Sequence, residues 1–251
     1  MERPLGEETA ETDDDESLPW WPSGDRGRTA SRSGLTRERI INAGVELIQR
    51  EGFQALTMRR IAECLNSGVM SLYWYIANRD ELVAVVVDEL LRGVPTPSPD
   101  LSWRQQVFEV CRAFVSILEP HRHALAALPS GIAPGPHLLR MTNDIYGALG
   151  SAGFYGDDLI QGVDAIAALT IGLLFSEPGD DAGNGSEKAG EGRAAPSGVR
   201  DVDFGTLDQS RYPNLAAAAG ARRLGGDTLD YALDTLLDGL EVRLRRTQQN
   251  D

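Results

Sequence analysis

The sequence predicts an all-α protein, with a small N-terminal three-helix unit followed by a larger helical part. Apolar residues recur at helical spacing from about residue 35 to the end of the chain. Threonine or asparagine stands before several of these segments, and glycine or proline follows several of them. With 251 residues, 41% hydrophobic and 25% charged, the chain has the composition of an ordinary globular protein.

Residues 1–33 are predicted to form a disordered tail, because acidic residues, serine, glycine and proline dominate them and cannot build a core. This start has no hydrophobic stretch of the kind found in a secretory signal. No apolar run is expected to approach the roughly 20 residues that a membrane span needs. We therefore expect a cytoplasmic protein with no membrane partner.

The first ordered helix is predicted to begin after Thr36, whose side chain can cap it, and to end at Gly52. Its apolar stripe consists of Ile40, Ile41, Gly44, Val45, Leu47 and Ile48. Thr57 caps a short second helix in the same way. The buried face of that second helix is predicted to be Met58, Ile61, Ala62 and Leu65.

A tight turn is predicted at residues 66–68, "NSG", because Asn66 tolerates the left-handed conformation. The third helix is expected over residues 69–76, and its inward side chains are Val69, Leu72 and Ile76. Asn78 or Asp80 then opens a fourth helix, which the prolines of residues 93–99 end. Helices joined by such a turn have the layout of a helix-turn-helix.

Three consecutive aromatic residues occupy the third helix, in the stretch "GVMSLYWYIANRD". Consecutive helical positions differ by about 100°, so Tyr73, Trp74 and Tyr75 cannot all face one core. We expect some of these rings to face outward and to form a contact surface. On helical period alone, an aromatic core layer fits the stretch equally well.

Four motifs follow one another between Leu35 and Leu91. They read "LTRERI", "GFQALTMRRIA", "SLYWYI" and "NRDEL". In this order and spacing they resemble the DNA-binding domain of the tetracycline-repressor (TetR) family of bacterial transcription regulators. One departure lies in the turn, where Asn66, Ser67 and Gly68 replace the glycine, aliphatic and small capping residues usual in the family.

The resemblance implies that residues 34–80 are a helix-turn-helix domain that binds double-stranded operator DNA. The DNA-binding residues it implies are Thr57, Arg59, Val69, Met70, Ser71, Tyr73, Trp74, Tyr75 and Arg79. Hydroxyls and apolar atoms of a helix in the major groove can contact base edges and thymine methyl groups. Tyrosine hydroxyls and arginines can contact phosphates, which fix the register without reading sequence.

Residues 81–251 are predicted to form a helical regulatory and dimerisation domain, with a flexible loop at about 177–210. Two long apolar helices near the C-terminal end exceed what one small domain needs. We expect them to form a four-helix bundle in a homodimer. This half also resembles, more weakly, the C-terminal domain of the tetracycline-repressor subgroup.

By resemblance, a small-molecule effector binds inside this second half and changes the affinity for DNA. The candidate ligand-binding residues are Trp103, Phe114, His121, Leu125, Met141 and Tyr146. Each of these side chains fits an ordinary core position at least as well as a ligand contact.

The sequence predicts no catalytic residue, no cofactor and no metal site. His121 and His123 lie two positions apart and would point away from each other on a helix. Cys64 and Cys111 lie in apolar helical patterns, so we expect both to be buried free thiols. The predicted function is a ligand-responsive repressor of transcription; the alternative is a helical small-molecule-binding protein that no longer binds DNA.

Overall fold

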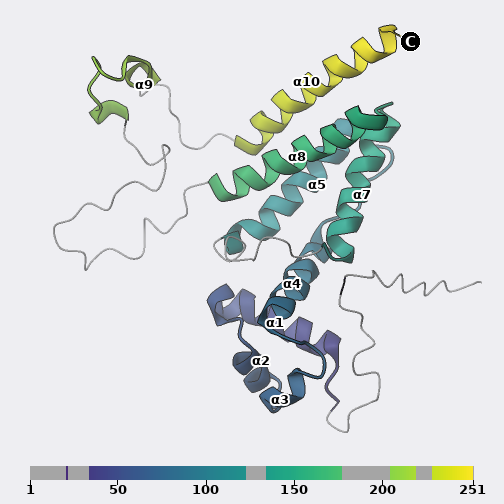
Figure 1. Ribbon diagram of the computed structural model, residues 1–251, viewed down its shortest axis with the longest axis vertical. Coiled ribbons are helices and arrows are strands. Elements are labelled where there is room, and N and C mark those ends of the chain that lie inside the picture. Colours follow the sequence, from purple (N-terminus) through teal and green to yellow (C-terminus); the bar gives the residue numbers. More distant parts are fainter. Residues whose placement is uncertain (1–20, 22–33, 123–133, 177–203, 219–227, 251) are drawn as a thin grey trace, which may run out of the picture. The chain divides into compact units, whose positions relative to one another are not determined.

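The computed structural model describes residues 21, 34–122, 134–176, 204–218 and 228–250. These residues form helices, with no strand among them, so the predicted all-α class is confirmed (Figure 1). The α-helices are α1 (Arg37–Glu51), α2 (Met58–Cys64), α3 (Val69–Leu72), α4 (Arg79–Leu90), α5 (Trp103–Leu118), α7 (Pro136–Ser151), α8 (Gly156–Ser176), α9 (Pro213–Ala218) and α10 (Thr228–Asn250). The predicted tail at 1–33, apart from residue 21, and residues 177–203 of the predicted loop lie outside the described residues.

Local sequence sets the ends of the first helices as predicted. Thr36 accepts a hydrogen bond from the backbone N–H of Arg39 at 3.2 Å, and Thr57 accepts one from Arg60 at 3.2 Å. Asn78, and not Asp80, caps α4, because its side-chain oxygen accepts the N–H of Glu81 at 2.8 Å. Each of these bonds satisfies a donor that the helix cannot pair internally.

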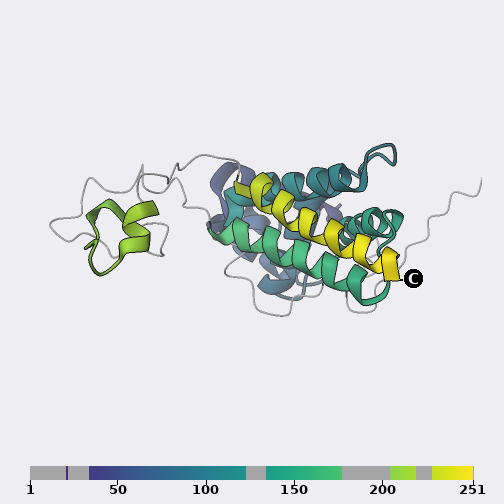
Figure 2. The ribbon, with the colours of Figure 1, turned by 90° about the horizontal axis from the view of Figure 1, so that it is seen from above.

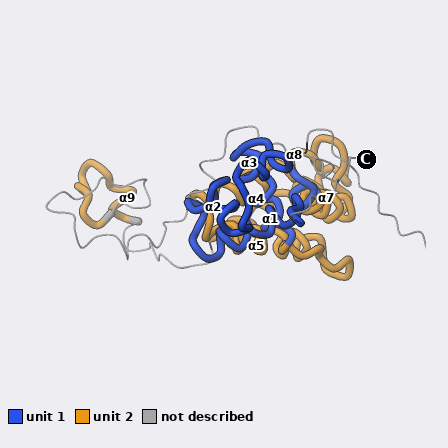
Figure 3. Tube along the Cα trace, turned by 90° about the horizontal axis from the view of Figure 1, so that it is seen from below, with its two compact units in different colours: residues 1–92, 128–139 blue, residues 93–127, 140–251 orange. Residues whose placement is uncertain are grey.

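The chain divides into two compact units (Figure 3). Unit 1 comprises residues 1–92 and 128–139, and unit 2 comprises residues 93–127 and 140–251. Helix α4 therefore packs as part of unit 1, whereas the sequence assigned it to the second domain. The border between the units falls inside α7.

In unit 1, α1 packs against both α4 and α2, and α2 packs against α3. The largest fully buried side chains of this unit are Ile40, Leu47, Ile48, Leu56, Ile61, Leu72, Ile76 and Leu82. Gly44 allows α1 to approach α4, since a Cβ atom there would lie 2.5 Å from a methyl group of Val86. The apolar pattern of the first four predicted helices thus forms one core.

A buried carboxylate joins the end of α4 to the start of α7 within unit 1. Asp88 is buried and accepts hydrogen bonds from the backbone N–H groups of His137 at 3.2 Å and Leu138 at 3.0 Å. Gly135 makes room for it, because a Cβ atom there would lie 2.4 Å from the Asp88 carboxyl carbon. These contacts satisfy two of the unpaired donors at the first turn of α7.

In unit 2, α8 packs against both α5 and α10, and α10 also contacts α5 (Figures 1 and 2). The buried side chains of α5 recur at helical spacing and are Val107, Val110, Cys111, Phe114 and Leu118. Arg104 of α5 pairs with Asp234 at 2.5 Å and Asp238 at 2.8 Å, both on α10. An apolar seam and this ion-pair cluster therefore hold the two helices together.

Helix α8 corrects one expectation and is partly exposed. Residues 156–175 are long and apolar enough to cross a membrane, by length and composition only, which contradicts the expectation that no run approaches that length. Three large apolar side chains of α8, Ile160, Ile171 and Phe175, are exposed although the helix packs against α5 and α10.

The two cysteines differ in environment. Cys111 is buried, and burial raises the pKa of its thiol to about 11. Cys64 is exposed at the last position of α2, so the expectation that both thiols are buried is wrong for this one. The buried positions of α2 are Met58, Ile61 and Ala62, and Cys64, at the end of the helix, is not among them.

Replacing Asp88 by alanine should lower the free energy of unfolding by about 1–3 kcal/mol, because the N–H groups of His137 and Leu138 lose their acceptor. Urea unfolding followed by circular dichroism measures this loss. Glu46→Ala, at an exposed position of α1, is the control and should change stability by less than ~0.5 kcal/mol. Equal stability of the Asp88 variant and the wild type would refute the proposed role of the cap.

Iodoacetamide at pH 8 should modify one thiol in the native protein, Cys64, and both thiols in denaturant. The thiolate is the reactive form, and Cys111 is both shielded and largely protonated at that pH. Intact-mass spectrometry counts the adducts, and Cys64→Ser should remove the native adduct. Two adducts forming together in the native protein would contradict the placement of Cys111.

Candidate nucleic-acid interface

A tight turn joins α2 to α3. Asn66 has φ 48°, the left-handed conformation predicted for it, and is the one non-glycine residue with positive φ among those described. The N–H of Ser67 donates to the carbonyl oxygen of Ala62 at 3.0 Å. Gly68 stands at the N-cap of α3 and offers no side-chain hydrogen bond. The altered turn therefore forms, and Asn66 supplies the conformation that glycine usually provides.

Helix α3 is shorter than predicted and ends at Leu72, not Ile76. A further turn continues it, since the N–H groups of Tyr75 and Ile76 donate to the carbonyl oxygen of Leu72 at 2.9 Å. Leu72 and Ile76 are 0% exposed, as expected. A four-residue helix has little stability alone, so these two anchors hold its orientation.

Tyr75 corrects the expected contact surface, because its ring is buried at 6% exposure. The chain leaves the α-helix after Leu72, and Tyr75 then lies beside the buried Ile76. The core interpretation is thus right for one of the three aromatic residues. It is wrong for Tyr73 and Trp74, which are 46% and 78% exposed.

The outward side of α3 and the following turn is apolar and aromatic. Met70 is 76% exposed, and Ser71 is exposed beside it. Val69 is half-buried at the start of the helix. Solvent-facing methionine and tryptophan side chains on one short segment form the kind of patch that marks an interaction site.

Two adjacent arginines on α2 are held differently. Arg59 has an 86% exposed side chain and donates through Nε to Glu63 at 3.1 Å. Arg60 donates to Glu63 at 3.0 Å and to both carboxylate oxygens of Glu51, at 3.1 and 2.7 Å. The contact to Glu63 follows from helical spacing, but Glu51 lies nine residues away on α1, where no sequence pattern indicates it.

The remaining predicted contact residues also lie in unit 1. Thr57 is exposed while its hydroxyl caps α2. Arg79 is exposed at the first position of α4. Glu81 of the same turn is neutralised by Arg37, 3.3 Å away, and accepts the N–H of Ala77 at 2.7 Å.

Charge is not spread evenly along the chain. Residues 34–92 contain seven arginines and eight acidic residues, a formal charge of −1, whereas the whole chain carries −14. The acidic excess therefore belongs to the rest of the chain. The overall charge does not by itself oppose a polyanion at this surface.

The predicted ligand residues have mixed surroundings in unit 2. Phe114 and Met141 are buried, and Tyr146 is half-buried. The ring of Trp103 meets that of Phe154 edge-on, with centroids 5.7 Å apart. His121 is half-buried, and burial lowers the pKa of its imidazole. Leu125 lies outside the described residues.

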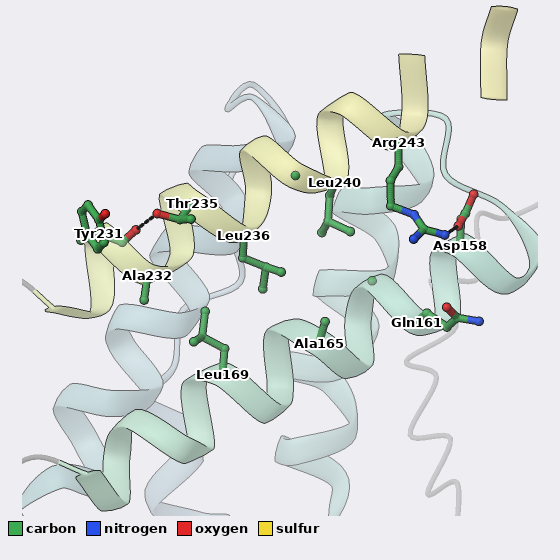
Figure 4. Close-up of a pocket in the computed structure, with 12 residues that line it drawn as sticks. Asp158, Gln161, Ala165, Leu169, Tyr231, Ala232, Thr235, Leu236, Leu240 and Arg243 are labelled. Carbon is green, nitrogen blue, oxygen red and sulfur yellow. Dashed lines mark hydrogen bonds and ion pairs between the residues drawn. The ribbon is translucent and has the colours of Figure 1, made fainter. Parts of the chain in front are cut away.

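An apolar groove of about 880 Å³ lies between α8 and α10, and none of the predicted ligand residues lines it. Ala165 and Leu169 of α8 face Leu236 and Leu240 of α10 across it (Figure 4). At one end Arg243 pairs with Asp158 at 2.7 Å. Among the described residues, no group of three or more His, Cys, Asp or Glu could hold a metal ion.

Known proteins match both parts of the chain. Residues 40–86 match the tetR family of bacterial regulatory proteins, and residues 96–244 match the tetracyclin repressor-like C-terminal domain. An HTH-type transcriptional regulator of Saccharopolyspora erythraea is 30% identical over 69% of this chain and 73% of its own length. The HTH-type transcriptional repressor DrrR1 of Streptomyces coeruleorubidus is 26% identical over 88% of this chain and 83% of its own.

A solved structure shows the same architecture. The TetR family protein ActR of Streptomyces coelicolor, in complex with (S)-DNPA, is 27% identical with a TM-score of 0.65. The alignment covers 82% of this chain and 97% of ActR. With both of its parts matched, the chain belongs to the tetR family of bacterial regulatory proteins, with a tetracyclin repressor-like C-terminal domain.

Proposed function

We propose that the protein represses transcription by binding a palindromic operator as a homodimer, and that a small molecule releases it from DNA. The observation that carries this proposal is the exposure of Met70, Tyr73 and Trp74 on a segment anchored by Leu72 and Ile76. Exposed rings on a rigid support suit the major groove, where apolar atoms meet thymine methyl groups. DrrR1, a relative along most of the chain, is named a repressor. Such a regulator acts in the cytoplasm.

The DNA contacts divide into two kinds. Met70, Ser71 and Trp74 are assigned to base edges, and Val69 to their flank. Tyr73 and Arg79 are assigned to phosphates, where a hydroxyl and a guanidinium fix the register. Thr57 and Arg59 approach from α2. The buried Tyr75 is assigned a supporting role beneath this surface.

A small-molecule effector is supported by ActR, whose structure contains (S)-DNPA. We assign the effector site to unit 2, in the region of Trp103, Phe114, Met141 and Tyr146. Aromatic and apolar walls with a few polar groups are typical of such sites. His121 is the polar candidate, since its lowered pKa favours a neutral ring that can both donate and accept.

A homodimer is supported by the unburied apolar surface of α8 and α10. Ile171 and Phe175 of α8 and Val242 of α10 are exposed in the single chain. Packing α8 and α10 against their copies would form a four-helix bundle and cover the groove of Figure 4. Two symmetric reading units would then match half-sites about one helical turn, roughly 34 Å, apart.

The alternative is a ligand-binding protein that has lost DNA binding. One observation favours it: Gly68 gives α3 no side-chain cap. Binding to a duplex that the protein selects from a random pool, together with thermal stabilisation by small molecules, separates the two functions. Stabilisation without selection of any sequence would favour the alternative.

Replacing Arg59 by alanine should weaken operator binding by about 1–3 kcal/mol, roughly 5- to 150-fold, because the proposed contact of its guanidinium with a base edge is lost. Fluorescence anisotropy on the selected duplex measures the Kd. Arg92→Ala removes the same charge from an exposed position outside the helix-turn-helix and is the matched control. Equal affinities of the two variants would count against the assignment of Arg59.

Replacing Leu169 by glutamate should convert the dimer to a monomer, because the groove would then bury an unpaired carboxylate. Size-exclusion chromatography with light scattering should change from twice the 27.2 kDa chain mass to that mass. Gln54→Glu adds the same charge at an exposed position of unit 1 and should leave the dimer intact. A dimeric Leu169 variant would refute this interface.

A further inference from the structure

Four side chains form a charged network on α2 and the end of α1. Glu63 gives one carboxylate oxygen to each arginine, accepting from Arg59 Nε at 3.1 Å and from Arg60 Nη1 at 3.0 Å. Glu51 accepts from Arg60 Nε and Nη2, in the two-pronged geometry that suits guanidinium and carboxylate. Arg50 lies 3.9 Å from Glu51 at the edge of the network.

The two arginines differ in how many of their guanidinium nitrogens are hydrogen-bonded within the network. In Arg60, Nε, Nη1 and Nη2 each donate a hydrogen bond to a carboxylate oxygen. Arg59 is held through Nε alone, and no partner among the described residues contacts its Nη1 or Nη2. Those two nitrogens can still donate in parallel to the O6 and N7 acceptors of guanine or to a phosphate.

We propose that Glu63 is a positioning residue that orients Arg59 for sequence-specific contact, and that Glu51 withholds Arg60 from DNA. The proposal rests on the proposed function, because it assumes that the surface reads an operator. It gives a role in DNA recognition to Glu63 and Glu51, two residues that would not themselves contact DNA. Their carboxylates decide which of two adjacent arginines takes part in recognition.

Orientation matters because an arginine side chain loses much rotamer freedom when it binds. A partner that already holds Nε reduces the entropy lost when the two Nη nitrogens engage a base. Arg60 and then Arg59 lower the pKa of the Glu63 carboxyl, so this partner is ionised at neutral pH.

The same carboxylates also oppose unspecific binding. A negative charge beside Arg59 repels phosphates that approach without the correct base contact, and a paired Arg60 contributes no counterion release. Specificity depends on the difference between the affinity for the operator and the affinity for a random sequence. The network should therefore raise the ratio of operator to random-sequence binding more than it raises operator affinity.

The variants Glu63→Gln and Glu51→Gln form a matched pair. Each removes one negative charge and leaves a single amide oxygen as acceptor, so each weakens the pairing of Arg60, but only Glu63→Gln also weakens the pairing of Arg59. Both sites are exposed, so thermal melting should show both variants folded with little change. Fluorescence anisotropy then gives the Kd for the selected duplex and for a shuffled duplex of equal composition.

Glu63→Gln should lower the ratio of the two affinities about two- to fivefold, the range that an exposed charged pair supports. Glu51→Gln should strengthen binding to both duplexes by a similar factor, with a steeper salt dependence as Arg60 becomes available to phosphates. In an Arg59→Ala background, Glu63→Gln should no longer change the ratio, since the residue that it positions is gone.

Equal changes in the ratio for the two single variants, or no change for Glu63→Gln, would overturn the proposal while leaving operator binding intact. An unaltered effect of Glu63→Gln in the Arg59→Ala background would overturn it as well. Failure of the wild-type protein to select any duplex would instead refute the proposed function itself.

Discussion

The burial of Leu72 and Ile76 is the constraint on which the exposed surface of α3 and the following turn depends. Helix α3 spans only Val69–Leu72, far too short to be stable by its own hydrogen bonds. Its direction is therefore set by two aliphatic side chains inserted into the core of unit 1. Once they are fixed, the geometry of a single turn determines that Met70 and Trp74 project into solvent.

Around these two residues, unit 1 combines a closely packed interior with ion pairs on its surface. The interior is aliphatic and closely packed, and Gly44 lets α1 and α4 approach so closely that a methyl group would not fit between them. The exterior carries side-chain ion pairs, such as those that Glu63 makes with Arg59 and Arg60, and such exposed pairs are weak individually. The rigid backbone fixes where these side chains lie, so weak pairs are enough to set their directions.

Features set by neighbours in sequence could be predicted, and features set by distant segments could not. The caps at Thr36 and Thr57 and the left-handed Asn66 follow from local backbone chemistry. The burial of Tyr75 could not be predicted, because helical period alone does not show where a short helix ends. The contact of Glu51 with Arg60 joins residues on different helices without a sequence signal. The sequence does not show which side of α8 is exposed in the single chain, because apolar composition does not distinguish a core from a surface that a second chain covers.

The fit of Asp88 against Gly135 links two positions 47 residues apart in the chain. The carboxylate occupies the volume that any larger residue at position 135 would need, and the first turn of α7 depends on that carboxylate. A residue larger than glycine at position 135 can therefore be accommodated only when Asp88 is replaced as well. Across relatives, aspartate at position 88 should be accompanied by glycine at position 135, whereas glycine at 135 does not require the aspartate.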